Sequence, residues 1–312
     1  MGAFHEGEQA VQALAGVRER FAATGAPFLR DYMPEQHREF FALLPFLLVG
    51  SVQADGQPWA SVLAGPPGFA RSPDPRLLDV RAWPQEDDPL AQALKPGAPI
   101  GLLGIQPHTR RRNRLNGHVE YADGKSFGVH VDQSFGNCPK YIQAREPRFT
   151  GKRDQRPHVV RMRKLDDAAQ QLVRSADTLF VATSHPKAMA GGSPEQGIDV
   201  SHRGGKPGFV RVDDGAVLTL PDFTGNSYFN TLGNIALEPR CGLLFIDYET
   251  GDTLQVAARA TIVTQGKELA SLRGALRLLR LEITQAIRAE AALPIAWGPA
   301  ELSPVLENTG TW

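Results

Sequence analysis

The feature of this 312-residue sequence that most limits its fold is an internal repeat. SVLAGPPGF, from Ser61, matches SHRGGKPGF, from Ser201, and GLLGI, from Gly101, matches GLLFI, from Gly242, at nearly the same offset. PEQHREFFALLPFLLVGS lines up with DDAAQQLVRSADTLFVATS before these segments, and FGVHVDQSF with LRLEITQAI after them. Four matches in one order are hard to explain without duplication, so we predict two copies of one structural unit.

Each copy shows a helical stretch followed by short segments of β-branched, aromatic or alternating residues between Gly, Pro and Asp turns, a pattern typical of strands. The expected strands are 46–53, 59–63, 77–82, 100–105, 118–121 and 126–131, then 178–183, 198–202, 208–212, 216–220, 242–247, 253–263 and 278–284. Segment 269–292 is expected to form a strand preceded by a helical turn, because its leucines alternate. Regular strand spacing favours a small barrel over a parallel α/β sheet, so the predicted class is mainly β (α+β).

The repeat also predicts how the chain is divided. We expect an N-terminal helical arm at 1–30, a first unit at 31–150, a linker rich in Arg, Lys and Pro at 151–165, and a second unit at 166–312.

Composition excludes several classes of protein. Lys and Arg together number 34, as do Asp and Glu, so the chain lacks the positive excess that nucleic-acid binders and polybasic membrane proteins use. Charged residues interrupt the N-terminus where a secretory signal needs an apolar run, and no apolar stretch approaches the roughly 20 residues of a spanning helix. Cys138 and Cys241 lie far apart, which fits a reducing cytoplasm better than a disulfide framework.

The most distinctive polar run is PDFTGNSYFNTLGNI, from Pro221 to Ile235, between two apolar strands. A turn from a strand into a helix exposes backbone N–H groups that can bind phosphate, although an N-capped surface turn has the same pattern. The short hydrogen-bonding side chains in this run are Asp222, Thr224, Asn226, Ser227, Asn230 and Thr231. The first copy has Glu86, Asp87 and Asp88 at the matching place, and because carboxylates repel phosphate we expect an anion in the second unit only.

The preceding strand is also better suited to an anion in the second copy than in the first. Ser201, His202 and Arg203 stand where the first copy has Ser61, Val62 and Leu63. A cation and an imidazole in place of aliphatic side chains favour a ligand role, with the guanidinium pairing with phosphate. An exposed rim of the barrel is the alternative.

The first copy has a polar stretch of its own, DQSFGNCPKYIQ (132–143), in which Asn137, Lys140 and Tyr141 follow a strand. Cys138 in this stretch is either a nucleophile or, more commonly for such a residue, a structural thiol. We expect the run HTRRRNRLNG (108–117) to form the tip of a hairpin, from which one arginine can reach a neighbouring anion.

Several familiar motifs are missing. No P-loop, GxGxxG or GxSxG motif occurs, and the eight histidines show neither HExxH nor Cys/His ligand spacing, so no metal site is predicted.

NCPKYIQ in one copy, together with SHRGGKPGF and PDFTGNSYFNTLGNI in the other, resembles the pyridoxamine 5′-phosphate oxidase-like FMN-binding split barrels. More narrowly, the sequence is similar to tandem members with two barrels on one chain, and the resemblance covers roughly 32–312. It implies two six-stranded Greek-key split barrels with flanking helices, FMN in a cleft between them, and a degenerate site in the first barrel.

The resemblance implies a role for each polar segment. Ser201, His202 and Arg203 would contact the flavin ring and phosphate, and Asn137, Lys140 and Tyr141 would supply the contribution from the other barrel. The phosphate and the ribityl chain would be held by Asp222, Phe223, Thr224, Asn226, Asn230 and Thr231. The pyridoxamine phosphate oxidases proper carry an Arg-Lys pair in this turn, where the present chain has Gly225-Asn226-Ser227. We therefore expect the phosphate to depend on Arg203, backbone amides and Lys140.

The function implied is that of an FMN-dependent oxidoreductase transferring hydride at flavin N5 to or from a small molecule, with NAD(P)H as a candidate donor. No catalytic residue is assigned. The alternatives are a flavin carrier without turnover, a haem-binding split barrel with His202 or another histidine as ligand, and a dimerisation module without a ligand. A homodimer is expected because split barrels expose an apolar face.

Overall fold

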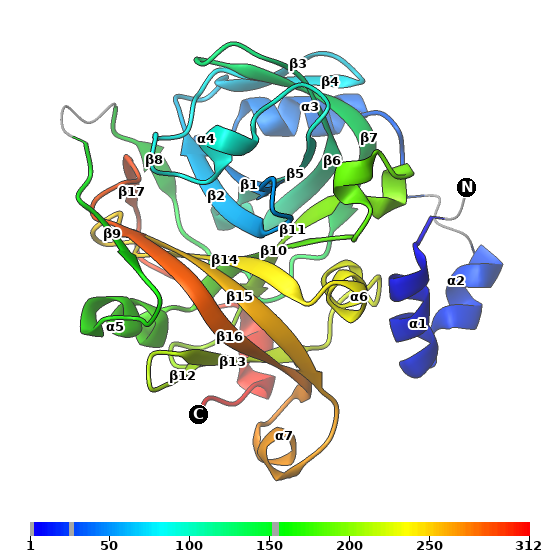
Figure 1. Ribbon diagram of the computed structural model, residues 1–312, viewed down its shortest axis with the longest axis vertical. Coiled ribbons are helices and arrows are strands. Elements are labelled where there is room, and N and C mark those ends of the chain that lie inside the picture. The colour runs from blue at the N-terminus through cyan, green and yellow to red at the C-terminus, as the bar shows by residue number, and fades with distance from the viewer. Residues whose placement is uncertain (1–2, 25–27, 152–155) are drawn as a thin grey trace.

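The computed structural model describes residues 3–24, 28–151 and 156–312, and its antiparallel sheets confirm the mainly β class (Figure 1). The first sheet has the strand order β2-β1-β5-β6-β7-β4-β3. Its strands are β1 (Phe46–Val52), β2 (Pro58–Ala64), β3 (Ala70–Asp74), β4 (Leu77–Val80), β5 (Pro99–Gln106), β6 (Arg111–Ala122) and β7 (Phe127–Asn137).

The second sheet has the order β11-β10-β14-β15-β16-β13-β12, and β9 (Val159–Met162) pairs with β16 outside this path. Its strands are β10 (Thr178–Ser184), β11 (Ile198–Gly204), β12 (Arg211–Asp213), β13 (Val217–Phe223), β14 (Arg240–Ile246), β15 (Thr253–Val263) and β16 (Ala275–Ala289). A small third sheet joins β8 (Pro147–Phe149) to β17 (Ile295–Trp297). When the strands of the second sheet are counted from β10, its order is the same as that of the first.

Helices lie at the edges of both sheets. They are α1 (Glu6–Leu14), α2 (Arg18–Thr24), α3 (Glu35–Ala42), α4 (Leu90–Ala93), α5 (Asp167–Ser175), α6 (Asn230–Leu237) and α7 (Lys267–Ser271), with short 3-10 turns η1 (Pro107–Thr109), η2 (Ala188–Ala190), η3 (Pro194–Gln196) and η4 (Pro304–Asn308). The helix α3 precedes β1 as α5 precedes β10, and α4 follows β4 as α6 follows β13. The matched segments of the sequence therefore occupy matching places in the two sheets.

Each sheet has its own apolar core, and a third apolar cluster joins the two. Phe46 and Leu103 from the first sheet meet Phe180 and Leu244 from the second in this shared cluster. The glycines that open the two matched GLL segments explain how closely the sheets approach. A Cβ on Gly101 would lie 2.6 Å from the carbonyl oxygen of Ile198, and one on Gly242 would lie 2.5 Å from that of Pro58.

The N-terminal arm packs against the second unit, where α1 lies beside α6 and α2 lies on the far side of α1 (Figure 1). His5 accepts a hydrogen bond from Gly7 N–H and so caps α1. A Cβ on Gly7 would lie 2.2 Å from the carbonyl oxygen of Gly233 in α6, so only glycine permits this approach.

The strand predictions hold for most segments. β15 has the predicted bounds, and 269–292 contains the helical turn α7 and then β16. The prediction that the whole run 108–117 forms the tip of a hairpin was wrong. The turn ends at Arg110, and residues from Arg111 onward form β6. The polar side chains of this strand resemble those of a loop in sequence. β3, β8 and β17 were not predicted, and the predicted linker at 151–165 contains β9.

In the described residues the end strands of each sheet, β2 and β3 or β11 and β12, do not pair with each other, so no closed barrel is found there. The two tandem split barrels therefore remain a prediction. No helix of the described chain is long and apolar enough to span a membrane.

Candidate functional site

A cleft between the two sheets is lined by every side chain that the sequence proposed as a cofactor contact. These are Ser201, His202, Arg203, Asp222, Phe223, Thr224, Asn226, Asn230, Thr231, Asn137, Lys140 and Tyr141. We call it the arginine cleft, because it is also lined by Arg112, Arg114 and Arg277. Its volume is about 110 Å³. Whether these residues bind a cofactor stays a prediction.

Segments of both units meet at this cleft. Tyr141, just after the last strand of the first sheet, donates its hydroxyl proton to the carbonyl oxygen of Thr224 (3.1 Å), just after β13 in the second. Three residues of the lining, Tyr141, Ser227 and Phe229, are non-glycine residues with φ near +65°. Left-handed backbone costs free energy for such residues and is concentrated at ligand sites. The loops of this cleft are therefore held in a strained shape by their surroundings.

Two of the arginines come from the run that the sequence suggested was a hairpin tip. Arg112 and Arg114 lie on β6, where residues two apart point to the same side of the sheet. Both therefore line the cleft, whereas a single reaching arginine was predicted. Arg277, on β16, was not predicted at all.

Arg114 is the centre of a buried polar network. Its guanidinium donates to Asp199 (2.8 Å), to Asn230 Oδ1 (3.0 Å) and to the hydroxyl of Ser201, which Thr231 also contacts (3.1 Å). Asn116 donates to the same carboxylate of Asp199 (2.7 Å). Burial lowers the pKa of the guanidinium, and the charge of Asp199 opposes this effect. A buried ion pair needs further hydrogen bonds to keep its geometry. The two terminal nitrogens of Arg114 and the Oδ1 atom of Asp199 have them, whereas Arg114 Nε has none among the described residues.

The N-terminal arm contributes Glu8, which sequence reasoning missed. Asn230 donates its amide proton to Glu8, so the arm reaches the first residue of α6. Glu8 is buried and accepts the backbone N–H of His5 (2.9 Å). Burial, reinforced by the charge of Asp199, raises its pKa well above the usual value. No sequence signal linked two residues so far apart in the chain.

Asp222 orders two arginines. Its carboxylate accepts from Arg277 (3.0 Å) and lies 3.5 Å from Arg203. Asp222 lines the cleft as predicted, and its carboxylate contacts the side chains of Arg203 and Arg277. Its role is therefore to position these two arginines in the lining.

Several buried polar atoms of the lining have no hydrogen-bond partner among the described residues. They are Arg203 Nε, Arg114 Nε, Asn137 Nδ2 and His202 Nδ1. Burial, together with the charges of Arg112 and Arg203, lowers the pKa of His202 well below 6.5, so its imidazole is neutral. Leaving buried polar atoms without partners costs free energy, so four such atoms in one lining require an explanation.

Cys138 lies in the same cleft. Arg112 donates to its carbonyl oxygen (2.8 Å) and approaches its sulfur at 3.6 Å. Burial lowers the pKa of Arg112 to about 10. In the part of the chain that the structure describes, no histidine or carboxylate hydrogen-bonds the thiol, so the geometry offers no base for a catalytic cysteine.

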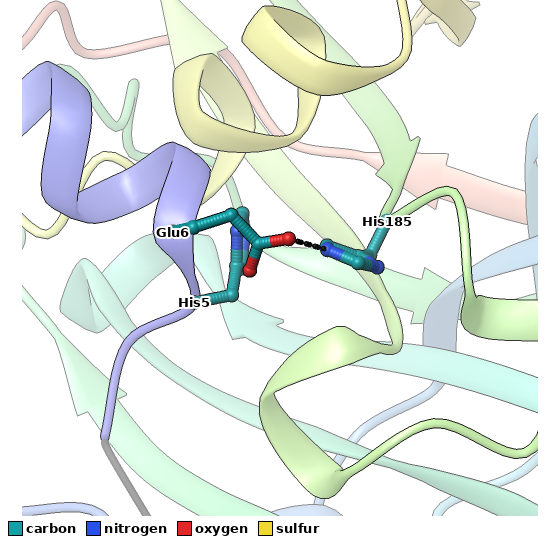
Figure 2. A group of neighbouring side chains, drawn as sticks. All are labelled: His5, Glu6 and His185. Atoms are coloured by element: carbon teal, nitrogen blue, oxygen red, sulfur yellow. Dashed lines mark hydrogen bonds and ion pairs between the residues drawn. The ribbon is translucent and has the colours of Figure 1, made fainter.

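A separate cluster, His5, Glu6 and His185, links α1 to the loop after β10 (Figure 2). His185 Nε2 lies 3.2 Å from Glu6 Oε1. The Nδ1 atoms of the two histidines accept backbone N–H groups, from Gly7 and Lys187 respectively (both 3.1 Å). A neutral ring with Nδ1 as acceptor carries its proton on Nε2, which leaves no lone pair there for a metal. The cluster therefore does not fit a metal ion.

Comparison with known proteins leaves the family open. No family model matches the chain, and no curated protein matches it.

Solved structures match parts of the chain. A pyridoxamine 5′-phosphate oxidase-like protein of Lactobacillus delbrueckii is 19% identical, with a TM-score of 0.30, over 40% of this chain and 94% of its own. An FMN-binding protein of Syntrophomonas wolfei is 9% identical, with a TM-score of 0.28, over 38% and 80%. HutZ, the heme storage protein of Vibrio cholerae, is 14% identical, with a TM-score of 0.28, over 41% and 95%. At these scores the matches carry no functional argument.

Proposed function

We propose that the arginine cleft binds FMN and that the protein is an FMN-dependent oxidoreductase acting on a small molecule. The observation that carries this proposal is the set of unpartnered donor atoms on Arg203, Arg114 and Asn137, three residues that line one cleft. A phosphate group presents several acceptor oxygens and negative charge, and so fits both the number of donors and their sign.

The charge of the lining supports an anionic ligand. Arg112, Arg114, Arg203, Arg277 and Lys140 line the cleft, against a single lining carboxylate, Asp222. The first turn of α6 adds backbone N–H groups, which favour phosphate at a helix N-terminus. These groups replace the Arg-Lys pair of the oxidases proper.

The size of the cleft limits how FMN is held. Clefts that enclose a whole drug-sized ligand usually exceed about 300 Å³, and this one has about 110 Å³. The enclosed part suits the phosphate end, so the flavin ring belongs on the open side. The rings of Tyr141 and Phe223, 5.5 Å apart, are aromatic parts of the lining that could contact it.

When bound, FMN supplies hydride chemistry at N5, and the protein supplies orientation and hydrogen bonds. The arginines and Asn137 would hold the phosphate end. The neutral imidazole of His202 would keep one nitrogen available for a hydrogen bond to the ligand.

The proposal is tested by titrating the purified protein with FMN and with riboflavin, which lacks the phosphate. We expect Arg203→Gln to weaken FMN binding by about tenfold or more, because a charge-assisted hydrogen bond contributes about 1.5–3 kcal/mol. Riboflavin affinity should be the same in both proteins. Arg259→Gln, which removes an exposed arginine on β15, is the matched control.

The other possible outcomes would contradict the proposal or favour one of the alternatives. Equal affinity for FMN and riboflavin would contradict a phosphate site, and a protein that retains neither would refute flavin binding. A Soret band would favour the haem alternative with His202, whose Nδ1 has no partner. Oxidation of NAD(P)H above the free-flavin background separates an oxidoreductase from a flavin carrier.

A further inference from the structure

The hairpin of β6 and β7 carries a cross-strand histidine pair outside the arginine cleft. His118 and His130 are directly opposite each other in the register, and their rings stack with centroids 4.8 Å apart. A Cβ on the neighbouring Gly117 would lie 1.8 Å from the carbonyl oxygen of His130, so the two strands approach unusually closely here. Glycine at position 117 therefore permits this close approach of the strands beside the pair.

Two irregularities of the register flank this pair, and each places a carboxylate beside it. Asn116 pairs with Gln133 and Gly117 with Val131, which leaves Asp132 as an extra residue of β7.

On the other side, Val119 pairs with Val129 and Tyr121 with Gly128, which leaves Glu120 as an extra residue of β6. β-bulges redirect side chains and are frequent next to functional sites. One bulge on each side of one histidine pair thus turns two acids toward it.

The distances define a group of convergent ligands. Glu120 Oε2 lies 3.9 Å from His118 Nε2 and 3.9 Å from His130 Nδ1. Asp132 Oδ2 lies 3.2 Å from His118 Nδ1. A carboxylate oxygen accepts only, so the hydrogen bond to Asp132 selects the tautomer with the proton on Nδ1, and in that tautomer Nε2 has a lone pair for a metal ion. This arrangement, in which a carboxylate orients a ligating histidine, is frequent in metal sites and is the opposite of that at His5 and His185.

We propose that His118, His130 and Glu120 bind a divalent transition metal ion such as Zn²⁺, with Asp132 as a positioning residue. Two imidazoles and a carboxylate suit zinc, and water would fill the remaining coordination positions. Metal–ligand bonds of about 2.0–2.2 Å need the three atoms to move closer together. The side chain of Glu120 is 54% exposed and so is free to make that movement.

Charge supports a cation at this place. Among the described residues no lysine or arginine forms an ion pair with Glu120 or Asp132, whose ionic neighbours are the two histidines. Neither acid lines the arginine cleft, so the metal site and the proposed flavin site can be tested separately.

The test is calorimetric titration of the full chain, free of tags and chelator-treated, with Zn²⁺, together with the absorption spectrum of added Co²⁺. We expect one ion per chain with micromolar affinity. His130→Asn should abolish binding, and Asp132→Asn should weaken it about 10–100-fold, as loss of an orienting partner does. His158→Asn, which removes an exposed histidine beside Glu290, should change nothing.

The outcomes that would overturn the proposal are also defined. Binding weaker than millimolar in the unaltered chain would refute it. Binding that survives His130→Asn but is lost in Glu6→Gln would place the ion at the His5 cluster instead. Because His118 and His130 are more than one third exposed, the variants should keep the urea midpoint of the unaltered chain, and this separates loss of the site from loss of the fold.

Discussion

The arginine cleft and a second cleft occupy corresponding places in the two sheets. The second cleft is lined by Leu63, Asp88, Thr253, Gln255 and Ala289, among others, and has a volume of about 820 Å³. Each cleft includes a pair of neighbouring strands from one sheet, β6 and β7 or β15 and β16, and part of an end strand from the other sheet, β11 or β2. Because the backbone is similar in both, any difference in chemical character between the two clefts must come from their side chains.

The register shows which residues correspond. Arg114 pairs with Leu103 in the first GLL segment, and Gln255 pairs with Leu244 in the second. Both then donate to a serine of the matched SxxxG segments: Arg114 to Ser201, and Gln255 to Ser61 (2.9 Å).

The neighbouring positions correspond in the same way. Arg112 pairs with Asn137, whereas Thr253 pairs with Ala289. Corresponding backbone positions thus carry the cations Arg112 and Arg114 in one cleft and the neutral side chains Thr253 and Gln255 in the other. This difference shows that the character of each site resides in its side chains rather than in the fold.

The largest effect is expected when Arg114 is converted to its counterpart, as Arg114→Gln. Asp199 would keep its place without its cation, and breaking a buried ion pair costs about 3–5 kcal/mol. Urea unfolding measures this loss, and Arg259→Gln should stay within about 0.5 kcal/mol of the unaltered chain. An unchanged urea midpoint in Arg114→Gln would contradict the prediction, because it would show that glutamine is tolerated at this position in both clefts.

A smaller effect is expected at the arm, whose Glu8 hydrogen-bonds Asn230 in the arginine cleft. Gly7→Ala places a Cβ against the backbone of Gly233, and such overpacking typically costs about 1–3 kcal/mol. We expect urea unfolding at lower concentration and weaker FMN binding. Gly197→Ala is the control, because a Cβ there meets nothing closer than 3.7 Å. Equal behaviour of the two variants would contradict the helix contact.

A pH effect should distinguish His202 from its counterpart, Val62. The folded protein keeps His202 neutral below 6.5, whereas the unfolded chain takes up the proton. The stability that this residue contributes is therefore present above pH 6.5 and is lost as the pH falls below it. His202→Val should reduce the slope of stability against pH by up to about 1.4 kcal/mol per unit in that range. Parallel curves from urea unfolding at pH 5, 6 and 7 would refute this.

The smallest effect is expected in the second cleft. Glu86 and Asp87 form exposed ion pairs with Arg156 and Arg161, and such pairs contribute about 0–1 kcal/mol. Glu86→Gln combined with Asp87→Asn should therefore leave stability nearly unchanged, and FMN should still bind at one per chain. A stoichiometry of two would mean that only these acids had kept phosphate from the second cleft.

The sequence predicted those parts of the fold that have a clear apolar period. The strand at 253–263 alternates, and the GLL segments match, so both were placed correctly. β6 was misread in part because Arg112 and Arg114 turn a polar face toward the cleft, and in sequence such a face looks like a solvated turn.

The site residues were predictable where they belong to a compact motif. The cofactor segments lie on short continuous runs, whereas Glu8 and Asp199 join the site only through tertiary packing. The metal ligands had a weak signal, since HVE at 118–120 and HVD at 130–132 flank the turn around Gly124. Ligand spacings along one helix or loop do not detect a pair formed across a hairpin.

Because the two clefts are built from different residues of one chain, a substitution alters one and spares the other. An assembly of two identical subunits has no such freedom, since one gene encodes both of its clefts and each change occurs twice. Here selection can preserve Arg114 while Gln255 drifts toward another use. The two clefts at the junction of the sheets can therefore change their side chains independently of each other.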